Sequence, residues 1–207
     1  MLTHRFGRAA TLTALVLAAV LSTGCPSTKW VNSWAQEPVA VAPMKKILVI
    51  GMAKEEANRR TFEDTLVKAL EGAGVSAVAS YTVMGDEKVN EENLRAKVKE
   101  GGFDGVTLTR LVSKETRVTS VPPSMYTAPG YGWGPYYGYS SWSTVYSPGY
   151  LISETVVRLE SQAWHAGDKG TLVWSGVSET VEPKSVPAIC SALSTLLVKD
   201  LKKHKLI

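Results

Sequence analysis

The side chains that most often carry catalytic chemistry are scarce in this chain. Among its 207 residues there are two cysteines and three histidines. No His-Glu-x-x-His, no Gly-x-Ser-x-Gly, no Cys-His pair and no metal-ligand spacing occurs in the sequence. The adjacent carboxylates Glu55/Glu56 and Glu91/Glu92 stand at predicted helix starts, where they complement the helix dipole. We therefore expect no enzyme activity, no cofactor and no metal site.

The first 25 residues are typical of a bacterial export signal. Arg5 and Arg8 give a basic start, and residues 9–21 form an apolar run too short for a spanning helix. The sequence 21–25 (LSTGC) resembles the lipobox, in which the cysteine is acylated and begins the mature chain. Ser22 departs from that pattern, because Leu is commonest there. We expect residues 1–24 to be a signal peptide and Cys25 to carry lipid; an ordinary cleavage site is the alternative.

Lipid on Cys25 would hold the protein at a membrane, because each buried methylene contributes about 0.8 kcal/mol. Pro26 stands where Asp marks inner-membrane retention in enteric bacteria. We therefore expect a lipid-anchored protein of the cell envelope, on the periplasmic face of the outer membrane. Cys190 then has no intramolecular disulfide partner, and its apolar neighbours predict a buried thiol.

The chain also has only a small excess of positive charge. The formal net charge is +4, and loss of Arg5 and Arg8 with the leader lowers it to +2. Such a small excess does not favour a nucleic-acid partner.

Residues 25–44 are predicted to be a lipid anchor and a tether. Pro38 and Pro43 bracket a short stretch with little periodicity. Trp30 and Trp34 interrupt this segment. We expect them to pack on the domain or to lie at the lipid interface rather than to stack on a ligand.

From Lys45 onward, strands and helices alternate. The apolar run 47–50 (ILVI) predicts a strand covered on both faces. A helix follows over 57–73, and further elements are a strand at 75–84, a helix at 90–100 and a strand at 106–112. Such β-α-β-α-β order predicts parallel strands with right-handed crossovers.

The second half of the chain predicts an antiparallel hairpin and a closing helix. Residues 154–163 alternate as in a strand with one solvated face, and 172–177 return after the turn 166–170. The helix spans 185–203. The predicted fold class is α/β, β-α-β-α-β followed by an antiparallel hairpin and a C-terminal helix in one mixed sheet. Residues 45–207 would form a single domain.

Several of these segments together resemble a family of uncharacterised bacterial lipoproteins. They are the strand 46–51 (KILVIG), the helix containing 62–64 (FED), the strand 75–81, the Trp-containing hairpin and the final helix. The strand order is also similar to the α/β domains of envelope assembly lipoproteins, such as the curli secretion channel subunit and the domain preceding the propeller in the Tol system. The resemblance implies an envelope domain without a catalytic motif.

An insertion at 120–150 holds most of the tyrosines of the chain, interleaved with glycine. Tyrosine and tryptophan offer amphipathic contact area at low entropic cost, so we expect a Gly-rich aromatic loop that binds a protein partner or a glycan. The alternative is a loop that folds back on the hairpin or stays disordered. The candidate contact residues are Tyr131, Trp133, Tyr136, Tyr137, Tyr139 and Trp142.

Three arginines are candidates for an anion site. Arg59 and Arg60 lie in the first turn of a predicted helix, where cations oppose the helix dipole, and they follow the first strand of the α/β unit. Arg110 lies in the later strand 106–112 and would complete the site. Solvent-exposed arginines without a ligand are the alternative.

These observations predict a non-enzymatic envelope lipoprotein that presents an α/β interaction domain to a protein partner or an assembly, with a homo-oligomer possible. The alternative function is a binding module for glycans or cell-wall polysaccharide.

Overall fold

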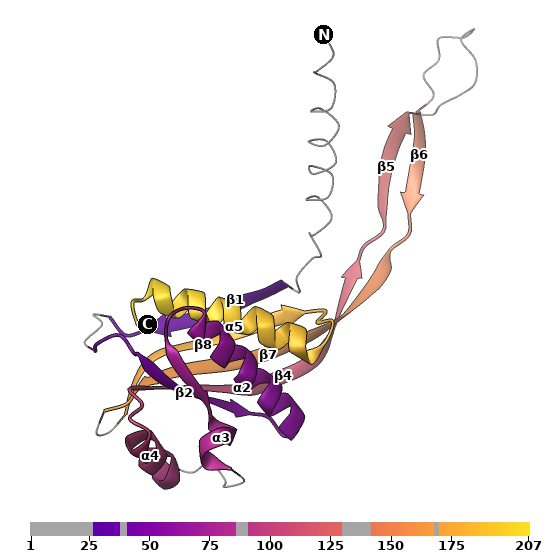
Figure 1. Cartoon of the computed structure of the whole chain (residues 1–207). Helices are drawn as coiled ribbons and strands as arrows, with labels where there is room; N and C mark the ends of the chain where they lie inside the picture. The colour runs from indigo at the N-terminus through magenta and orange to yellow at the C-terminus, as the bar shows by residue number, and fades with distance from the viewer. Residues whose placement is uncertain (1–26, 38–40, 86–90, 130–141, 168–169) are drawn as a thin grey trace, which may run out of the picture.

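The computed structural model describes residues 27–37, 41–85, 91–129, 142–167 and 170–207. A mixed sheet forms the body, and a two-stranded ribbon projects from it (Figure 1). No helix within these ranges is long and apolar enough to cross a membrane. The elements in chain order are β1 (Ser27–Ala35), β2 (Lys46–Met52), α2 (Glu56–Glu71), β3 (Ser76–Ala79), α3 (Ser80–Met84), α4 (Glu91–Glu100), β4 (Gly105–Val121), β5 (Ser124–Pro129), β6 (Trp142–Ser147), β7 (Tyr150–His165), β8 (Thr171–Val181) and α5 (Val186–Lys203).

The six strands of the main sheet follow the order β1-β8-β7-β4-β2-β3. β2 is parallel to β3 and to β4, whereas β4, β7, β8 and β1 are joined by antiparallel pairs. The α/β fold class with one mixed sheet, a hairpin and a C-terminal helix is therefore confirmed. β5 and β6 form a separate two-stranded sheet.

Both faces of β2 are buried, as its continuous apolar run predicts. Ile47 and Val49 belong to the larger core cluster, which α2 and α5 cover. Leu48 and Ile50 pack on the other face with Phe103 and the apolar side of α4. A fully buried aliphatic side chain contributes about 1.5–3 kcal/mol, so β2 lies at the centre of the fold.

The two long helices form where their periodicity predicts them. α2 buries Phe62, Leu66 and Leu70, and Gly74 follows its end with φ +89°, a backbone conformation that favours glycine. In α5, the side chain of Ser185 accepts a hydrogen bond from the backbone N–H of Ala188. Its buried side chains are Ile189, Cys190, Leu193, Ser194, Leu197 and Leu201.

The thiol of Cys190 is buried in this helix, as the sequence predicts. Burial raises its pKa to about 11, because an apolar environment disfavours the thiolate. The thiol therefore behaves as a small apolar group.

The tether expected before Lys45 is partly a strand. Residues 27–35 form β1, which pairs with β8 in antiparallel register from Ser27↔Val181 to Ala35↔Trp174. The Trp30 ring lies edge-on to Trp174 at 4.9 Å, above Gly176, where a Cβ atom would come within 3.1 Å of Trp30. The expectation of a tether is wrong for these residues, because pairing with the edge of β8 and packing of the partly buried Trp30 against the core are long-range contacts.

The strand expected at 75–84 ends at Ala79, and α3 follows it. The chain turns there because the buried carboxylate of Glu63 accepts hydrogen bonds from the hydroxyl of Ser80 at 2.7 Å and from the backbone N–H of Tyr81 at 3.1 Å. A side chain on α2 therefore decides where β3 stops.

Candidate functional site: a projecting hairpin

Much of the segment expected as a loop at 120–150 is a β-ribbon. β4 and β7 pair from Gly105↔His165 to Val121↔Tyr150, and β5 and β6 continue the ribbon from Ser124↔Ser147 to Pro129↔Trp142. The expectation of a loop is wrong for residues 120–129 and 142–150, because cross-strand pairing extends an antiparallel pair well past the sheet. In Figure 1 the ribbon extends far from the body.

The outer edges of the ribbon lose their neighbouring strands close to the body. β2 pairs with β4 only as far as Arg110, and β8 pairs with β7 only from Val156 onward. Beyond these points, no other strand in the described ranges pairs with either edge. Thr155 bonds to Glu182 through its backbone N–H and C=O. The remaining backbone groups along both outer edges are open to a partner strand or to water.

Irregular positions shape the ribbon where it leaves the body. A register shift between Leu111 and Ser113 marks a bulge, which increases local twist and bends a strand. Farther out, a Cβ atom on Gly149 would lie 2.9 Å from Pro123, so the close approach of the two chains there requires glycine. These features set the direction in which the ribbon points.

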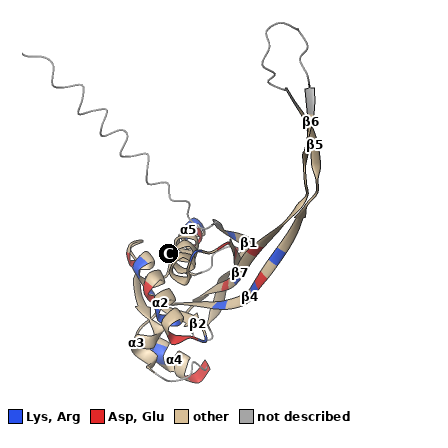
Figure 2. Ribbon diagram, turned by 90° about the vertical axis from the view of Figure 1, so that its right-hand side faces the viewer, with Lys and Arg blue, Asp and Glu red and all other residues tan. Residues whose placement is uncertain are grey.

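The outer part of the hairpin carries no charge. Residues 118–153 contain no Asp, Glu, Lys or Arg. The last charged residue on β4, Arg117, pairs directly opposite the first one on β7, Glu154. Figure 2 shows the change, because the ribbon is coloured for charged residues near the body and is tan throughout the described part of the outer ribbon.

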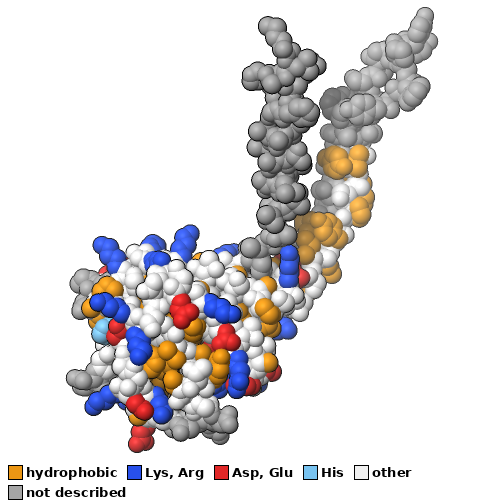
Figure 3. Space-filling view, in the orientation of Figure 1, with side chains coloured by type: hydrophobic (Ala, Val, Ile, Leu, Met, Phe, Trp, Pro, Cys, Tyr) orange, Lys and Arg blue, Asp and Glu red, His pale blue; other side chains and the backbone are white. Residues whose placement is uncertain are grey.

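Large apolar side chains on the ribbon are exposed to solvent. Met125 is 72% exposed and pairs opposite Tyr146, which is 58% exposed; Leu151 is 70% exposed. Figure 3 shows hydrophobic side chains over the projecting ribbon. Exposed apolar side chains in this concentration are typical of a contact surface.

Most of the aromatic contact residues expected from the sequence lie outside the described residues. This is so for Tyr131, Trp133, Tyr136, Tyr137 and Tyr139, whose binding role stays a prediction. Trp142 is described as the first residue of β6. Met125, Tyr146 and Leu151 are not among the contact residues expected from the sequence, although Tyr146 belongs to the aromatic segment itself. The long run without charge is a sequence signal that identifies the segment of all three.

Ion pairs connect the hairpin to the body where β4 and β7 leave the main sheet. Glu179 on β8 is largely buried and accepts hydrogen bonds from Arg158 at 2.9 Å and from Arg117 at 3.0 Å. Arg158 also donates to Glu115 at 2.8 Å. The hydrogen bond from Arg158, followed by that from Arg117, lowers the pKa of Glu179.

The ion pairs of Glu179 predict that the free energy of unfolding decreases at acidic pH. Because the pKa of Glu179 is lower in the folded protein than its ordinary value of 4.5, the unfolded chain takes up the proton first as the pH falls. Its stabilisation is complete well above that value and is lost as the pH drops through the folded pKa. We expect E179Q to lower the free energy of unfolding at pH 7 by about 1–3 kcal/mol, and this difference to shrink toward pH 3.

Urea unfolding at each pH measures the effect. E71Q, at an exposed position near the end of α2, is the matched control and should stay within about 0.5 kcal/mol of the parent chain. A difference between E179Q and the parent that does not change with pH would contradict the assignment.

The three arginines of the expected anion site are each engaged with a carboxylate. Arg59 lies 3.4 Å from the buried Glu63, and Arg60 donates to Glu56 at 2.8 Å while its guanidinium lies over the ring of Tyr81. Arg110 pairs with Glu160 across β4 and β7 at 2.6 Å. The paired carboxylates neutralise the guanidinium charges that an anion would need. We therefore assign no function to these three arginines.

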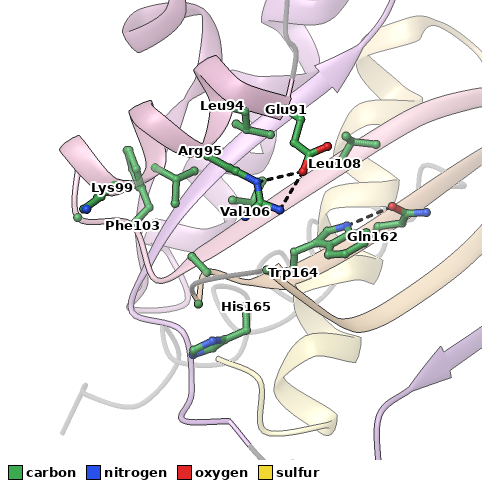
Figure 4. Close-up of a pocket in the computed structure, with 15 residues that line it drawn as sticks. Glu91, Leu94, Arg95, Lys99, Phe103, Val106, Leu108, Gln162, Trp164 and His165 are labelled. Carbon is green, nitrogen blue, oxygen red and sulfur yellow. Dashed lines mark hydrogen bonds and ion pairs between the residues drawn. The ribbon is translucent and has the colours of Figure 1, made fainter.

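A groove of about 830 Å³ lies between α4 and the sheet. Figure 4 shows Leu94, Phe103, Val106 and Trp164 around it. From Trp164, a polar row continues along the sheet. The indole N–H donates to Gln162 at 3.1 Å, the Gln162 amide donates to Glu160 at 3.1 Å, and Glu160 binds Arg110. Among the described residues, no three His, Cys, Asp or Glu side chains gather as a metal site would require.

Comparison with known proteins adds structural neighbours. No protein-family model matches the chain, and no curated protein matches it. The chain is similar to the PelC dodecamer from Paraburkholderia phytofirmans, with 12% identity and a TM-score of 0.47 over 87% of this chain and 99% of that one. For a PDZ domain protein from Parabacteroides distasonis, the identity is 10% and the TM-score 0.34, over 83% of this chain and 34% of that one. Because these TM-scores are below 0.5, we transfer no residue role or activity.

Proposed function

We propose that this protein is a non-enzymatic lipoprotein of the bacterial cell envelope that holds a binding hairpin out to a partner. In this proposal, acylated Cys25 anchors the chain at the periplasmic face of the outer membrane. The α/β body is the rigid support, and the hairpin is the binding element. The partner is an envelope protein or assembly.

One observation supports this proposal above the others: the hairpin projects from the body, lacks charge beyond Arg117 and Glu154, and exposes apolar side chains. None of residues 118–127 and 144–153 of the ribbon is buried. A two-stranded ribbon is at best marginally stable by itself in water. Its exposed surface therefore serves contact rather than folding.

Self-association is compatible with the same geometry. The two free edges of the ribbon run in opposite directions, so a strand edge of a second copy can pair with either. An assembly of several copies would present several hairpins to one partner.

A glycan-binding module is the second candidate, favoured by two tryptophans on the sheet face that lies opposite α5. Trp34 is 52% exposed there, and Trp164 lines the groove beside α4. The row of Gln162, Glu160 and Arg110 next to Trp164 offers donors and acceptors to sugar hydroxyls. Aromatic faces with polar neighbours suit a sugar ring.

The hairpin tip provides the decisive test. In a pull-down from crosslinked envelopes, we expect replacement of residues 131–142 by a Gly/Ser linker of equal length to lower partner retention at least about tenfold, because tryptophan and tyrosine dominate binding energies. The thermal midpoint should change little, since loop closure depends weakly on composition. Single changes W133A and W142A should account for much of the loss.

W34A is the matched control, because it removes an exposed tryptophan from the body. It should leave protein capture unchanged. Sedimentation with cell-wall polysaccharide separates the two candidates, since the glycan function predicts loss of polysaccharide binding in W34A or W164A. Equal protein capture by the parent and the linker variant would refute the role of the tip.

A further inference from the structure

The start of β1 and the root of the hairpin lie at the same end of the sheet. Ser27 pairs with Val181, Val181 with Val156, and Val156 with Glu115. This row of residues crosses the sheet from β1 to β4. With neighbouring strands about 4.8 Å apart, it spans about 14 Å.

The first residue of β1 is at the end of the strand that points toward the hairpin. β1 is antiparallel to β8 and β8 is antiparallel to β7, so β1 runs in the same direction as β7, which enters the body from the hairpin. Going backward from Ser27 therefore leads toward the hairpin side. Pro26 alone separates Ser27 from Cys25, and this piece of chain spans at most about 7 Å.

Measured along the strands, Cys25 can reach the position at which the hairpin carries its last charged residues. Ser27 is level with the pair Glu115↔Val156, and two residues farther out along the strands is the pair Arg117↔Glu154. These are the last charges before the uncharged outer ribbon. The end of β4 and all of β5, residues 116–129, continue for about 45 Å beyond the row of Ser27.

We infer that the outer ribbon, residues 118–129 and 142–153, binds the surface of a lipid bilayer as a second membrane contact beside the lipid on Cys25. The inference rests on the proposed function, in which the hairpin is the binding element and Cys25 is acylated. With the bilayer at the level of Cys25, a ribbon that continues about 45 Å beyond that level meets the membrane, and it stays at the surface by lying along the bilayer rather than along its normal.

The composition of the ribbon fits the interfacial zone of a bilayer. The absence of charge avoids the large cost of placing an ionised side chain in lipid. Tyr126, Tyr146 and Tyr150 are exposed, and tyrosine favours the membrane–water interface. Both ribbon edges lack neighbouring strands in the described ranges, and hydrocarbon would leave their backbone groups without partners. The inferred position is therefore at the headgroups.

Flotation with phosphatidylcholine vesicles tests the inference on the mature chain carrying C25S, which has no acyl group. We expect this chain to float with the vesicles and to remain bound at about 0.5 M salt, because the contact does not depend on charge. A variant in which Asn-Gly joins Arg117 directly to Glu154 should lose binding at least about tenfold.

Because removal of the whole outer hairpin also changes folding, substitutions of single side chains provide an independent test of binding. The double variant M125S/Y146S alters two exposed, directly opposed side chains and should lower the bound fraction about tenfold. M52S removes an apolar side chain that is 53% exposed on the body, and should bind as the C25S chain does. Thermal midpoints establish that each variant is folded.

Three results would overturn the inference: no flotation of the C25S chain, equal flotation of the C25S chain and the shortened one, or release of the C25S chain by salt. The proposed function is judged separately, by partner capture in detergent without a bilayer. Partner capture without vesicle binding overturns only the lipid contact. Vesicle binding without partner capture overturns only the role in partner binding.

Discussion

Replacing Cys25 by Ser should move most of the protein from the washed membrane pellet to the soluble fraction. Two or three acyl chains, each contributing about 0.8 kcal/mol per buried methylene, hold a protein at a membrane almost irreversibly. Without them, the hairpin alone provides a reversible contact that dilution and washing remove. Fractionation followed by immunoblotting measures the change.

The second cysteine is the natural control. C190A removes a buried thiol and leaves the export signal intact, so its product should stay in the pellet. Metabolic labelling with an alkyne fatty acid should be lost in C25S alone. If the C25S protein remains fully in the pellet after washing in high salt, lipid on Cys25 is not the anchor.

Replacing Glu63 by Ala should lower the free energy of unfolding by about 3–5 kcal/mol. The Glu63 side chain is fully buried and accepts hydrogen bonds from the backbone N–H of Gly51 at 2.9 Å, from Ser80 and from Tyr81. Arg59 lies beside it at 3.4 Å. Alanine leaves all these donors without their acceptor, which costs more than the contacts themselves contribute.

Urea unfolding with an unchanged m-value provides the measurement. D64A is the matched control, because Asp64 is the next residue on α2 and accepts a hydrogen bond from the Tyr81 hydroxyl at 2.7 Å in a partly exposed site. That hydrogen bond raises the pKa of Tyr81, so D64A should lower the Tyr81 pKa while costing much less stability. Equal losses in E63A and D64A would show that burial of Glu63 is not the cause.

Cross-strand partners explain most of what sequence analysis missed. The pattern of β1 shows few periodic apolar residues, and its strand depends on β8, about 150 positions later in the chain. The outer ribbon likewise depends on pairing across an insertion of mixed composition. Strand formation follows neighbours more than local preference, so such segments resemble linkers or loops until their partners are known.

The site itself was only partly predictable. The sequence pointed to the 120–150 segment as the contact region, and the absence of charge there is visible without a structure. The projection of the ribbon and the exposure of Met125 and Tyr146 follow from pairing and from the early end of β2 and β8. The charge offset of Arg59, Arg60 and Arg110 likewise depends on the carboxylates packed around them.

The sequence by itself determined the elements whose signals are local. β2, α2 and α5 were predictable because apolar periodicity, end glycines and a serine cap act within a few residues. Only the tertiary structure decided that β1 joins the sheet beside β8, that Glu63 is buried at the end of β3, and that the hairpin leaves the body at the end where β1 begins. These features join residues far apart in the chain, and their energies exist only when the partners meet.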